Sequence, residues 1–446
     1  MAHDAEWRHV LLEELAAPTR NALVGGPFGS DLVQSDYSPN GVPVIRGENV
    51  SVGRWVGGDF VFVPPSKAAK LAANTAGALD IVFTQRGANH YRQVAIVPAD
   101  TKGRFVISQS QMKLTVDLAK VDPLFTYYLF RSPTQQEYLQ RNAIQTGVPH
   151  TNLSILRKVP LRIPSLPTQR AIARILGMLD DKIELNGRTN ETLDAMARTL
   201  FKSWFVDFDP VRAKAEGRDA DLRKEIADLF PDRLEDSELG EIPAGWTVSK
   251  IGDKVATILG GTPSRAEPRY WGGDIPWINS GKANEFRVVE PSEFITKDGL
   301  DSSATTLLPT RTTVIAITGA TLGQVSLTEI ATCANQSIVG VIGKAEIPSE
   351  FLYLWIRSRI HDLLASQTGG AQQHINKNNV NDVRVLVPSE AIMRAFIGQA
   401  RPWFDRIKAC CLESRTLATL RDTLLPKLIS GELRVKDAEA LDKAHP

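Results

Sequence analysis

The sequence predicts an α+β protein: two repeated α/β domains separated by two long antiparallel helices that form a coiled coil, with a pseudo-twofold internal repeat. Two observations carry this fold class, a repeated stretch and a helical seam within each copy of it. The stretches 145–205 and 367–429 follow one plan. After a two-residue shift behind Gln-Thr-Gly, a constant offset of 224 relates them and carries Asn152 to Asn376. A fixed offset sustained over this length indicates two copies of one unit.

The second half of each copy has apolar residues at alternating steps of four and three. This period of 3.5 residues predicts a helix whose apolar stripe packs against a partner helix. The seam positions are Ile172, Leu176, Leu179, Ile183, Leu193, Leu200 and Trp204 in the first helix, and Trp403, Ile407, Leu417, Leu424 and Leu428 in the second.

The obvious partner of each helix is the other copy, because polar steps fall in mid-seam in both. These steps are Asn186 and Asn190 in the first helix and Cys410 and Ser414 in the second. Polar seam positions commonly fix register at a cost in stability. The alternative is two ordinary amphipathic helices, each packed on its own domain. Pro402 further predicts that the second helix bends or begins near that residue.

Short apolar runs separated by Gly, Pro, Asn and Asp predict strands and loops before each helix. Examples are 42–45, 81–84 and 94–97, and related runs return later in the chain with slightly drifting offsets. The predicted boundaries are 1–166 for the first domain, 167–208 for the first spacer helix, 209–245 for a linker, 246–389 for the second domain, 390–433 for the second spacer helix and 434–446 for a polar tail.

Composition is that of an ordinary soluble protein, with 446 residues, 43% hydrophobic and 23% charged. The length corresponds to about three average domains. No apolar run approaches the roughly 20 residues of a membrane span, and the polar N-terminus predicts no signal peptide. Three cysteines do not make a disulfide framework, so we expect a cytoplasmic protein without membrane contact. The net charge of +1 leaves nucleic-acid binding to local patches.

Searches for catalytic motifs identify no candidate. The sequence has no phosphate-binding loop of the G-x-x-x-x-G-K-[ST] type and no convincing cofactor glycine loop. Histidines and cysteines show no metal spacing, so we assign no catalytic or metal-binding residue. His150 and His374 are the only histidines repeated in both copies. One interpretation is that they act as general bases, for which the sequence shows no partners. The other, which we favour, is that they pack a loop or contact DNA.

The chain resembles the specificity subunits of type I restriction–modification systems, and the resemblance covers essentially its whole length. The segments that carry it are QTGVPHTNL (145–153), LRIPSLPTQ (161–169), LFKSWFVDFDPVRAKAEG (200–217), SELGEIPAGW (237–246), GGTPS (260–264) and LRDTLLPKLISGEL (420–433). The second copy departs from this pattern in QTGGAQQHINKNNV, which is less basic than its counterpart.

The resemblance implies a non-catalytic subunit with two target-recognition domains, which read the halves of an asymmetric, interrupted target in double-stranded DNA. It also implies partners: two modification subunits that methylate adenine, and restriction subunits that act as motor and nuclease. S-adenosylmethionine, ATP and Mg²⁺ are expected on those partners and no cofactor on this chain. Two alternatives stay open, a specificity subunit of a fused methylase–nuclease system and a coiled-coil scaffold that binds no DNA.

We expect DNA contacts from polar residues in loops that match between the two domains, since their donors and acceptors suit base edges or phosphates. These residues are Arg46, Asn49, Arg86, Gln109, Gln145, Thr146, His150, Asn152, Arg157 and Lys158 in the first domain, and Asn279, Lys282, Thr318, Gln336, Gln367, Thr368, His374, Asn376 and Lys377 in the second. For the repeated cluster around Gln-Thr-Gly, an alternative interpretation is that it caps and positions the loop leading into the helix.

Overall fold

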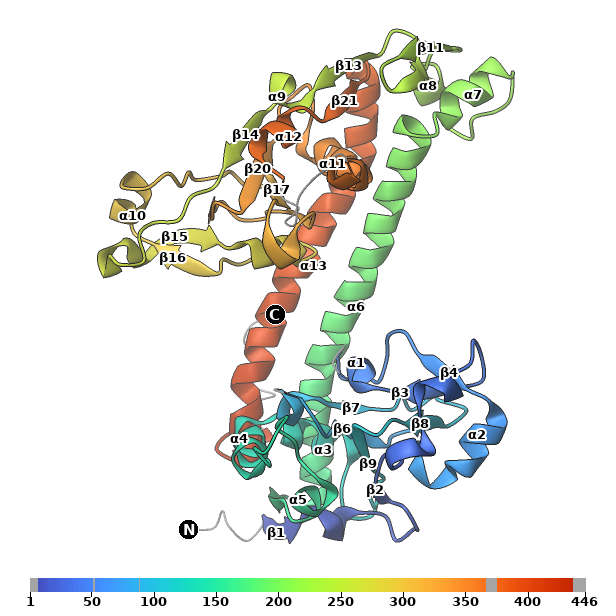
Figure 1. Ribbon diagram of the computed structural model, residues 1–446, viewed down its shortest axis with the longest axis vertical. Coiled ribbons are helices and arrows are strands. Elements are labelled where there is room, and N and C mark those ends of the chain that lie inside the picture. Colours follow the sequence, from blue (N-terminus) through green and yellow to red (C-terminus); the bar gives the residue numbers. More distant parts are fainter. Residues whose placement is uncertain (1–6, 51–52, 88, 366–374, 436–446) are drawn as a thin grey trace. The chain divides into compact units, whose positions relative to one another are not determined.

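A computed structural model describes residues 7–50, 53–87, 89–365 and 375–435. The chain divides into two compact units (Figure 1). Unit 1 comprises Met1–Glu184 together with Thr416–Pro446, and unit 2 comprises Leu185–Arg415. Each unit therefore contains one domain of the repeat and parts of both long helices.

Unit 1 contains two four-stranded sheets and one strand pair. The first sheet is antiparallel, in the order β2 (Leu23–Gly25), β9 (Gln111–Leu114), β6 (Ile81–Thr84) and β7 (Val94–Ile96). The second has the order β4 (Val61–Val63), β3 (Val42–Ile45), β8 (Phe105–Ile107) and β5 (Thr75–Ala76), with β3 parallel to β8. Strand β1 (Arg8–Leu11) pairs with β10 (Pro160–Ile163). The three strands predicted from short apolar runs are confirmed as β3, β6 and β7.

The helices of unit 1 cover these sheets. They are α1 (Gly47–Val50), α2 (Pro65–Lys70), α3 (Pro123–Arg131), α4 (Pro133–Asn142), α5 (Leu153–Arg157) and the first part of α6 (Leu166–Phe205). Helix α3 begins where Asp122 accepts a hydrogen bond from the amide of Phe125 and Pro123 occupies the first turn. Its apolar side chains, Phe125 and Phe130 among them, are buried in the main core of unit 1.

Unit 2 repeats this topology. Its first sheet has the order β14 (Ala256–Leu259), β20 (Ile338–Ile342), β17 (Thr313–Ala316) and β18 (Val325–Leu327). Its second has the order β16 (Glu293–Ile295), β15 (Trp271–Ile278) and β19 (Cys333–Ala334), with β15 parallel to β19. Strand β13 (Thr247–Lys250) pairs with β21 (Arg384–Val387), as β1 does with β10. The internal repeat predicted from the sequence is confirmed.

The helices of unit 2 are α7 (Asp209–Ala215), α8 (Lys224–Ala227), α9 (Ile251–Lys254), α10 (Lys297–Asp301), α11 (Ser349–Ala365), α12 (Lys377–Asn381) and the first part of α13 (Glu390–Ser430). The polar segment between the copies holds α7, α8 and the hairpin of β11 (Leu234–Ser237) with β12 (Gly240–Pro243). Its Val211 and Phe230 are buried in the core of unit 2, where Phe230 meets Trp204 with ring centroids 5.0 Å apart. This connector is therefore packed as part of unit 2.

Helices α6 and α13 run antiparallel in each unit (Figure 1). In unit 1, Ile172 and Leu176 share a core with Leu425 and Leu428. In unit 2, the later part of α6, around Trp204, shares a core with the earlier part of α13. The predicted pairing of the two long helices is confirmed, and every seam position predicted from the sequence is buried or half-buried.

Polar contacts occupy the middle of the seam. In unit 2, Asn186 donates to Glu413 Oε2 (2.9 Å) and Ser414 Oγ (3.3 Å) on α13. In unit 1, Arg421 Nη1 lies 2.7 Å from Asp180 Oδ1. Such directional contacts specify one register, because a shift of either helix would separate the partners.

Of the two alternatives predicted at Pro402, a bend or a start of the second long helix, the start is wrong. Helix α13 begins at Glu390 and continues without interruption past Pro402. A proline inside a helix costs about 3 kcal/mol. Here Phe396, Ala400 and Phe404 on both sides of the proline are fully buried, and this packing holds the segment helical.

Replacing Phe201 by Ala should destabilise unit 2 by about 3–5 kcal/mol. Phe201 is buried and contacts Phe351 of α11 (ring centroids 5.6 Å apart) and Phe396 of α13 (6.4 Å), so its loss leaves a cavity where three helices meet. Urea unfolding followed by tryptophan fluorescence measures the effect. The control is Met196→Ala on the same helix, which is 43% exposed and should change stability little. Equal unfolding midpoints for the two variants would contradict this packing.

Candidate nucleic-acid interface

Main-chain hydrogen bonds bring four loops of unit 1 together. The amide of Gln85 donates to Ser110 O (2.6 Å), and the amide of Thr151 donates to Gln85 O (2.9 Å). The amide of Gly87 donates to Pro149 O (3.2 Å) and that of Gly26 to Gln111 O (2.8 Å). The loops 26–31, 85–87, 108–110 and 144–150 therefore form one group, called here the loop cluster of unit 1.

Unit 2 holds its matching loops with the same bonds. The amide of Ile317 donates to Ser337 O (2.9 Å), and the amide of Ile375 donates to Ile317 O (3.0 Å). The amide of Gly260 donates to Ile338 O (2.9 Å). The loops 260–264, 317–319 and 335–337 form the loop cluster of unit 2.

Close approach of backbones fixes the glycines of both clusters. A Cβ on Gly26 would overlap the carbonyl oxygen of Ser108, and one on Gly260 would overlap that of Asn335. Only glycine fits at these two positions, which explains one glycine of the Gly-Gly pair at the start of each cluster. The framework is thus set by backbone geometry, and the exposed side chains on it are free to differ between the units.

Several predicted contact residues lie together in the loop cluster of unit 1. Arg86, Gln109, Gln145 and Thr146 are exposed there, and Gln109 donates from Nε2 to Gly29 O. His150 is half-buried, with Nδ1 3.0 Å from Val148 O and its backbone bridged to Arg86. The cluster therefore presents cationic and amide side chains on one group of loops, and His150 packs the loop that carries two of them.

In unit 2 the corresponding positions are Thr318 and Gln336. Thr318 is half-buried at the start of the loop, and Gln336 is exposed, with Oε1 accepting a hydrogen bond from Thr262 Oγ1. Gln367, Thr368 and His374 lie outside the described residues.

Other predicted residues are engaged within the fold. Asn49 is not available to DNA, because its side chain is fully buried and donates to Gly57 O (3.1 Å) and Asp59 O (2.8 Å). Asn152 and Asn376 cap α5 and α12, accepting from the amides of Ile155 (2.8 Å) and Asn379 (3.0 Å).

Lys282 is held by Glu285 (2.7 Å) and Glu290 (3.1 Å). Burial works against its charged form, yet these ion pairs prevail and raise the pKa of Lys282 above its ordinary value. Its charge is therefore already compensated inside unit 2. Asn279 caps the following turn by accepting from the amide of Gly281 (2.9 Å).

The remaining predicted cations stand outside the hydrogen-bonded loops. Arg46 pairs with Glu48 at the end of β3. Arg157 and Lys158 are exposed at the end of α5, and Lys377 is half-buried at the start of α12.

Sequence reasoning missed a buried arginine that occurs in both units. Arg54 precedes the parallel bridge of Trp55 with Ile96, and Arg287 precedes the parallel bridge of Val288 with Thr328. The two arginines lie in corresponding segments but one position apart. The amide of Val56 donates to Ile96 O and that of Val288 to Leu327 O, so Arg287 corresponds to Trp55. Alignment of the two copies therefore does not pair the two arginines.

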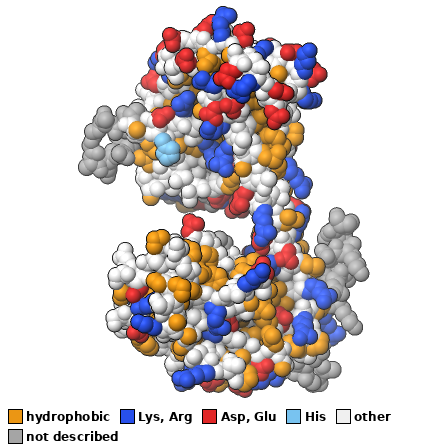
Figure 2. Space-filling view, turned by 90° about the vertical axis from the view of Figure 1, so that its right-hand side faces the viewer, with side chains coloured by type: hydrophobic (Ala, Val, Ile, Leu, Met, Phe, Trp, Pro, Cys, Tyr) orange, Lys and Arg blue, Asp and Glu red, His pale blue; other side chains and the backbone are white. Residues whose placement is uncertain are grey.

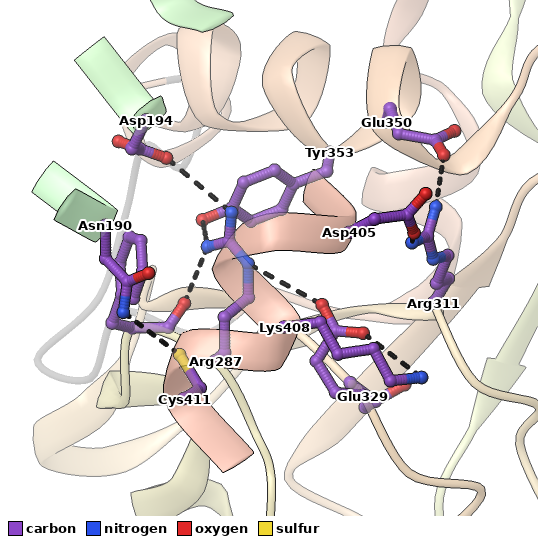
Figure 3. Close-up of polar contacts among 12 residues, drawn as sticks. Asn190, Asp194, Arg287, Arg311, Glu329, Glu350, Tyr353, Asp405, Lys408 and Cys411 are labelled. Atoms are coloured by element: carbon purple, nitrogen blue, oxygen red, sulfur yellow. Dashed lines mark hydrogen bonds and ion pairs between the residues drawn. The ribbon is translucent and has the colours of Figure 1, made fainter. Parts of the chain in front are cut away.

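Both arginines attach their domain to a long helix. Arg54 donates to Gly177 O of α6 (3.2 Å) and forms an ion pair with Asp181 of the same helix. Arg287 lies 3.7 Å from Asp194 of α6 and 3.9 Å from Glu329 (Figure 3). These contacts fix the domain on the helix, since unpairing a buried charge is strongly unfavourable.

The surface charge of the molecule is mixed. On the face drawn in Figure 2, acidic and basic side chains are interspersed over unit 2, whereas hydrophobic side chains cover a wider area of unit 1. Among the described residues, no group of three His, Cys, Asp or Glu side chains is placed to hold a metal ion. No helix in the described part of the chain is long and apolar enough to cross a bilayer.

Comparison with known proteins identifies the class. The model of the family "Type I restriction modification DNA specificity domain" matches residues 69–195 and 243–393, more than half of the chain. The chain is 29% identical to the HindI type I specificity subunit of Haemophilus influenzae over 74% of its length and 81% of that protein. It is 26% identical to the MjaIX specificity subunit of Methanocaldococcus jannaschii, over 70% of this chain and 69% of that protein.

A solved structure shares the fold. The S subunit of a type I restriction–modification system from M. genitalium superposes with a TM-score of 0.57 and 16% identity, covering 96% of this chain and 97% of that one. The chain belongs to the type I restriction–modification DNA specificity family, as its sequence motifs indicated.

Replacing Asn152 by Ala should weaken the start of α5 by about 1 kcal/mol, because the amide of Ile155 loses its acceptor. Asn152→Ser should restore stability, since serine also caps helices well. Hydrogen exchange of the α5 amides measures the effect. A serine variant that keeps normal exchange but loses DNA binding would show instead that Asn152 contacts DNA.

Proposed function

We propose that this chain is the DNA sequence-specificity subunit of a type I restriction–modification complex and recognises a bipartite, asymmetric target. The observation that carries the proposal is the duplicated loop cluster, in which one backbone framework holds side chains that differ between the two units at most positions, Gln109 and Gln336 excepted. Two equal frameworks with different surfaces suit a protein that reads two unlike half-sites. Family membership gives independent support.

Direct readout would come from exposed donors and acceptors of the loop clusters. Arg86 and Gln109 in unit 1, with Gln336 in unit 2, have side chains whose geometry matches guanine and adenine edges in the major groove. The exposed Arg157 and Lys158 are suited to phosphates, which position a protein on DNA without reading sequence.

Chemistry would belong to partner subunits, with this chain as their scaffold. We infer that modification subunits, two in number, methylate adenine N6 with S-adenosylmethionine, and that restriction subunits translocate and cut DNA with ATP and Mg²⁺. This division is supported by the sequence motifs of the family and by its relatives, which are named specificity subunits.

The spacing of the half-sites would be set by the long helices. Helices α6 and α13 each run from one unit into the other, at the boundaries after Glu184 and Arg415. A continuous helix has a fixed rise of about 1.5 Å per residue. The pair is therefore suited to act as a ruler between the two recognition domains.

Exchange of residues 8–163 for the equivalent region of a relative with another target should change one half of the recognised sequence only. These boundaries keep β1 paired with β10 and transfer the whole loop cluster of unit 1. Methylation-sensitive sequencing of DNA from cells carrying the complete system gives the readout. New bases in both halves would show that the domains do not read independently.

A seven-residue insertion in both helices, after Glu184 and after Arg415, should widen the gap between half-sites by about three base pairs. One heptad keeps the seam in phase and adds about 10 Å; base pairs are stacked about 3.4 Å apart. The half-sites themselves should stay unchanged. If the complex is active and still methylates the original sites, the partner subunits and not the helices set the gap between the half-sites.

A further inference from the structure

Two exposed apolar side chains lie in the loop cluster of unit 1. Phe28 is 88% exposed and Val148 is 62% exposed, the highest values among large hydrophobic side chains of the described residues. Single exposed apolar residues are common on protein surfaces. Here, however, the two largest exposures fall on two loops that hydrogen bonds join into one surface.

The loop that carries Phe28 is held in place on both sides. Before it, Gly26 packs against the backbone of Ser108, and Asn74 Nδ2 donates to Gly25 O (2.8 Å). After it, Gly29 accepts a hydrogen bond from Gln109, and the amide of Asp31 donates to Phe28 O (2.8 Å). The backbone of this loop is thus held by hydrogen bonds while the ring of Phe28 extends into solvent. Burial of the ring therefore does not stabilise the loop.

The neighbourhood of this ring is polar. Gln109 is bonded to the same loop, and Arg86, Gln145 and Thr146 are exposed on the adjoining loops of the cluster. The core of a protein–protein interface is instead depleted in charge and rich in apolar contacts. One aromatic ring among hydrogen-bonding side chains suits the face of a nucleobase, which stacks on aromatic rings while its edges accept hydrogen bonds.

We propose that Phe28 is a base-contacting residue that enters the first half-site as an apolar wedge against one base step. Proteins that insert apolar side chains between base pairs partly unstack the step and deform the duplex. Val148 adds a second apolar contact from a neighbouring loop of the cluster. This inference rests on the proposed DNA-recognition function. It adds an apolar contact to hydrogen-bond readout in unit 1, whereas the matching loop 260–264 of unit 2 has the sequence GGTPS, without an aromatic residue.

The experiment uses the complex of this chain with its modification subunits, bound to a DNA duplex that contains the sequence methylated by the system. In each duplex one base is replaced by 2-aminopurine, whose fluorescence rises when its stacking is disturbed. Wild-type complex should raise the fluorescence several-fold at one step of the first half-site, apart from the rise at any adenine that the modification subunits extrude for methylation. Phe28→Ala should abolish this rise and weaken specific binding by roughly tenfold, as expected for the loss of one base–aromatic contact.

Leu118→Ala is the matched control, since Leu118 is an exposed apolar residue of unit 1 (58%) outside the loop cluster. It should behave as wild type in fluorescence and affinity. A Phe28→Ala complex with wild-type fluorescence and affinity would overturn the proposal. So would a Phe28→Ala chain that no longer co-purifies with the modification subunits, because Phe28 would then be a protein-docking residue.

The same experiment distinguishes failure of the proposed DNA-recognition function from failure of the proposal for Phe28. If the wild-type complex bound its target and random DNA equally, both the proposed function and the wedge would fall. If wild type bound the target specifically and the fluorescence changed at no position other than the extruded adenines, only the proposed role of Phe28 would be contradicted.

Discussion

The pairing of α6 with α13 is the constraint on which both units depend, since each unit takes part of its core from each helix. In unit 1, Leu425 and Leu428, near the end of α13, pack with Ile172 and Leu176. In unit 2, Phe201 and the rest of the late part of α6 pack with the early part of α13. A chain lacking the last turns of α13 would therefore open the core of unit 1, although those turns are far from that core in sequence.

In both units, the contacts that hold the loops in place are separate from most of the exposed side chains. Main-chain hydrogen bonds and two glycines that tolerate no Cβ hold the loops, while Arg54 and Arg287 attach each domain to a helix. None of these contacts uses the exposed side chain of Arg86, while Gln109 and Gln336 add side-chain hydrogen bonds to Gly29 O and Thr262 Oγ1. Exposed side chains such as Arg86, which we propose to read DNA, can thus change without loss of the fold. This separation would allow two domains of one architecture to have unlike targets.

Much of this organisation was predictable from the sequence because helices tolerate few insertions. The offset of 224 survives through the long helices, so their seam and its polar positions follow directly from periodicity. Strands such as β3 and β6 were found from short apolar runs between turn residues.

The environments of individual side chains were harder to predict from the sequence. Asn49 resembles a loop residue suited to DNA, yet its side-chain amide donates to the carbonyl groups of Gly57 and Asp59. Lys282 forms ion pairs with two glutamates in the connection between β15 and β16. Arg54 and Arg287 stand one position apart in corresponding segments, so alignment of the two copies does not pair them. The Gly-Gly-Pro-Phe-Gly string (25–29) was the one sequence signal for Phe28, since a phenylalanine among glycines has few neighbours on which to pack.

The central claim is that each unit reads its own half of one DNA target. Site-specific photocrosslinking tests it most directly, with a photoreactive amino acid placed at Gln109 in one variant and at the matching Gln336 in another. Each variant is bound, together with the modification subunits, to DNA that contains the sequence methylated by the system. The photoreactive residue should crosslink to bases of one half-site, and the two variants should crosslink to different half-sites. Crosslinks from both positions to the same half-site, or none from either in a complex that remains bound, would contradict the account.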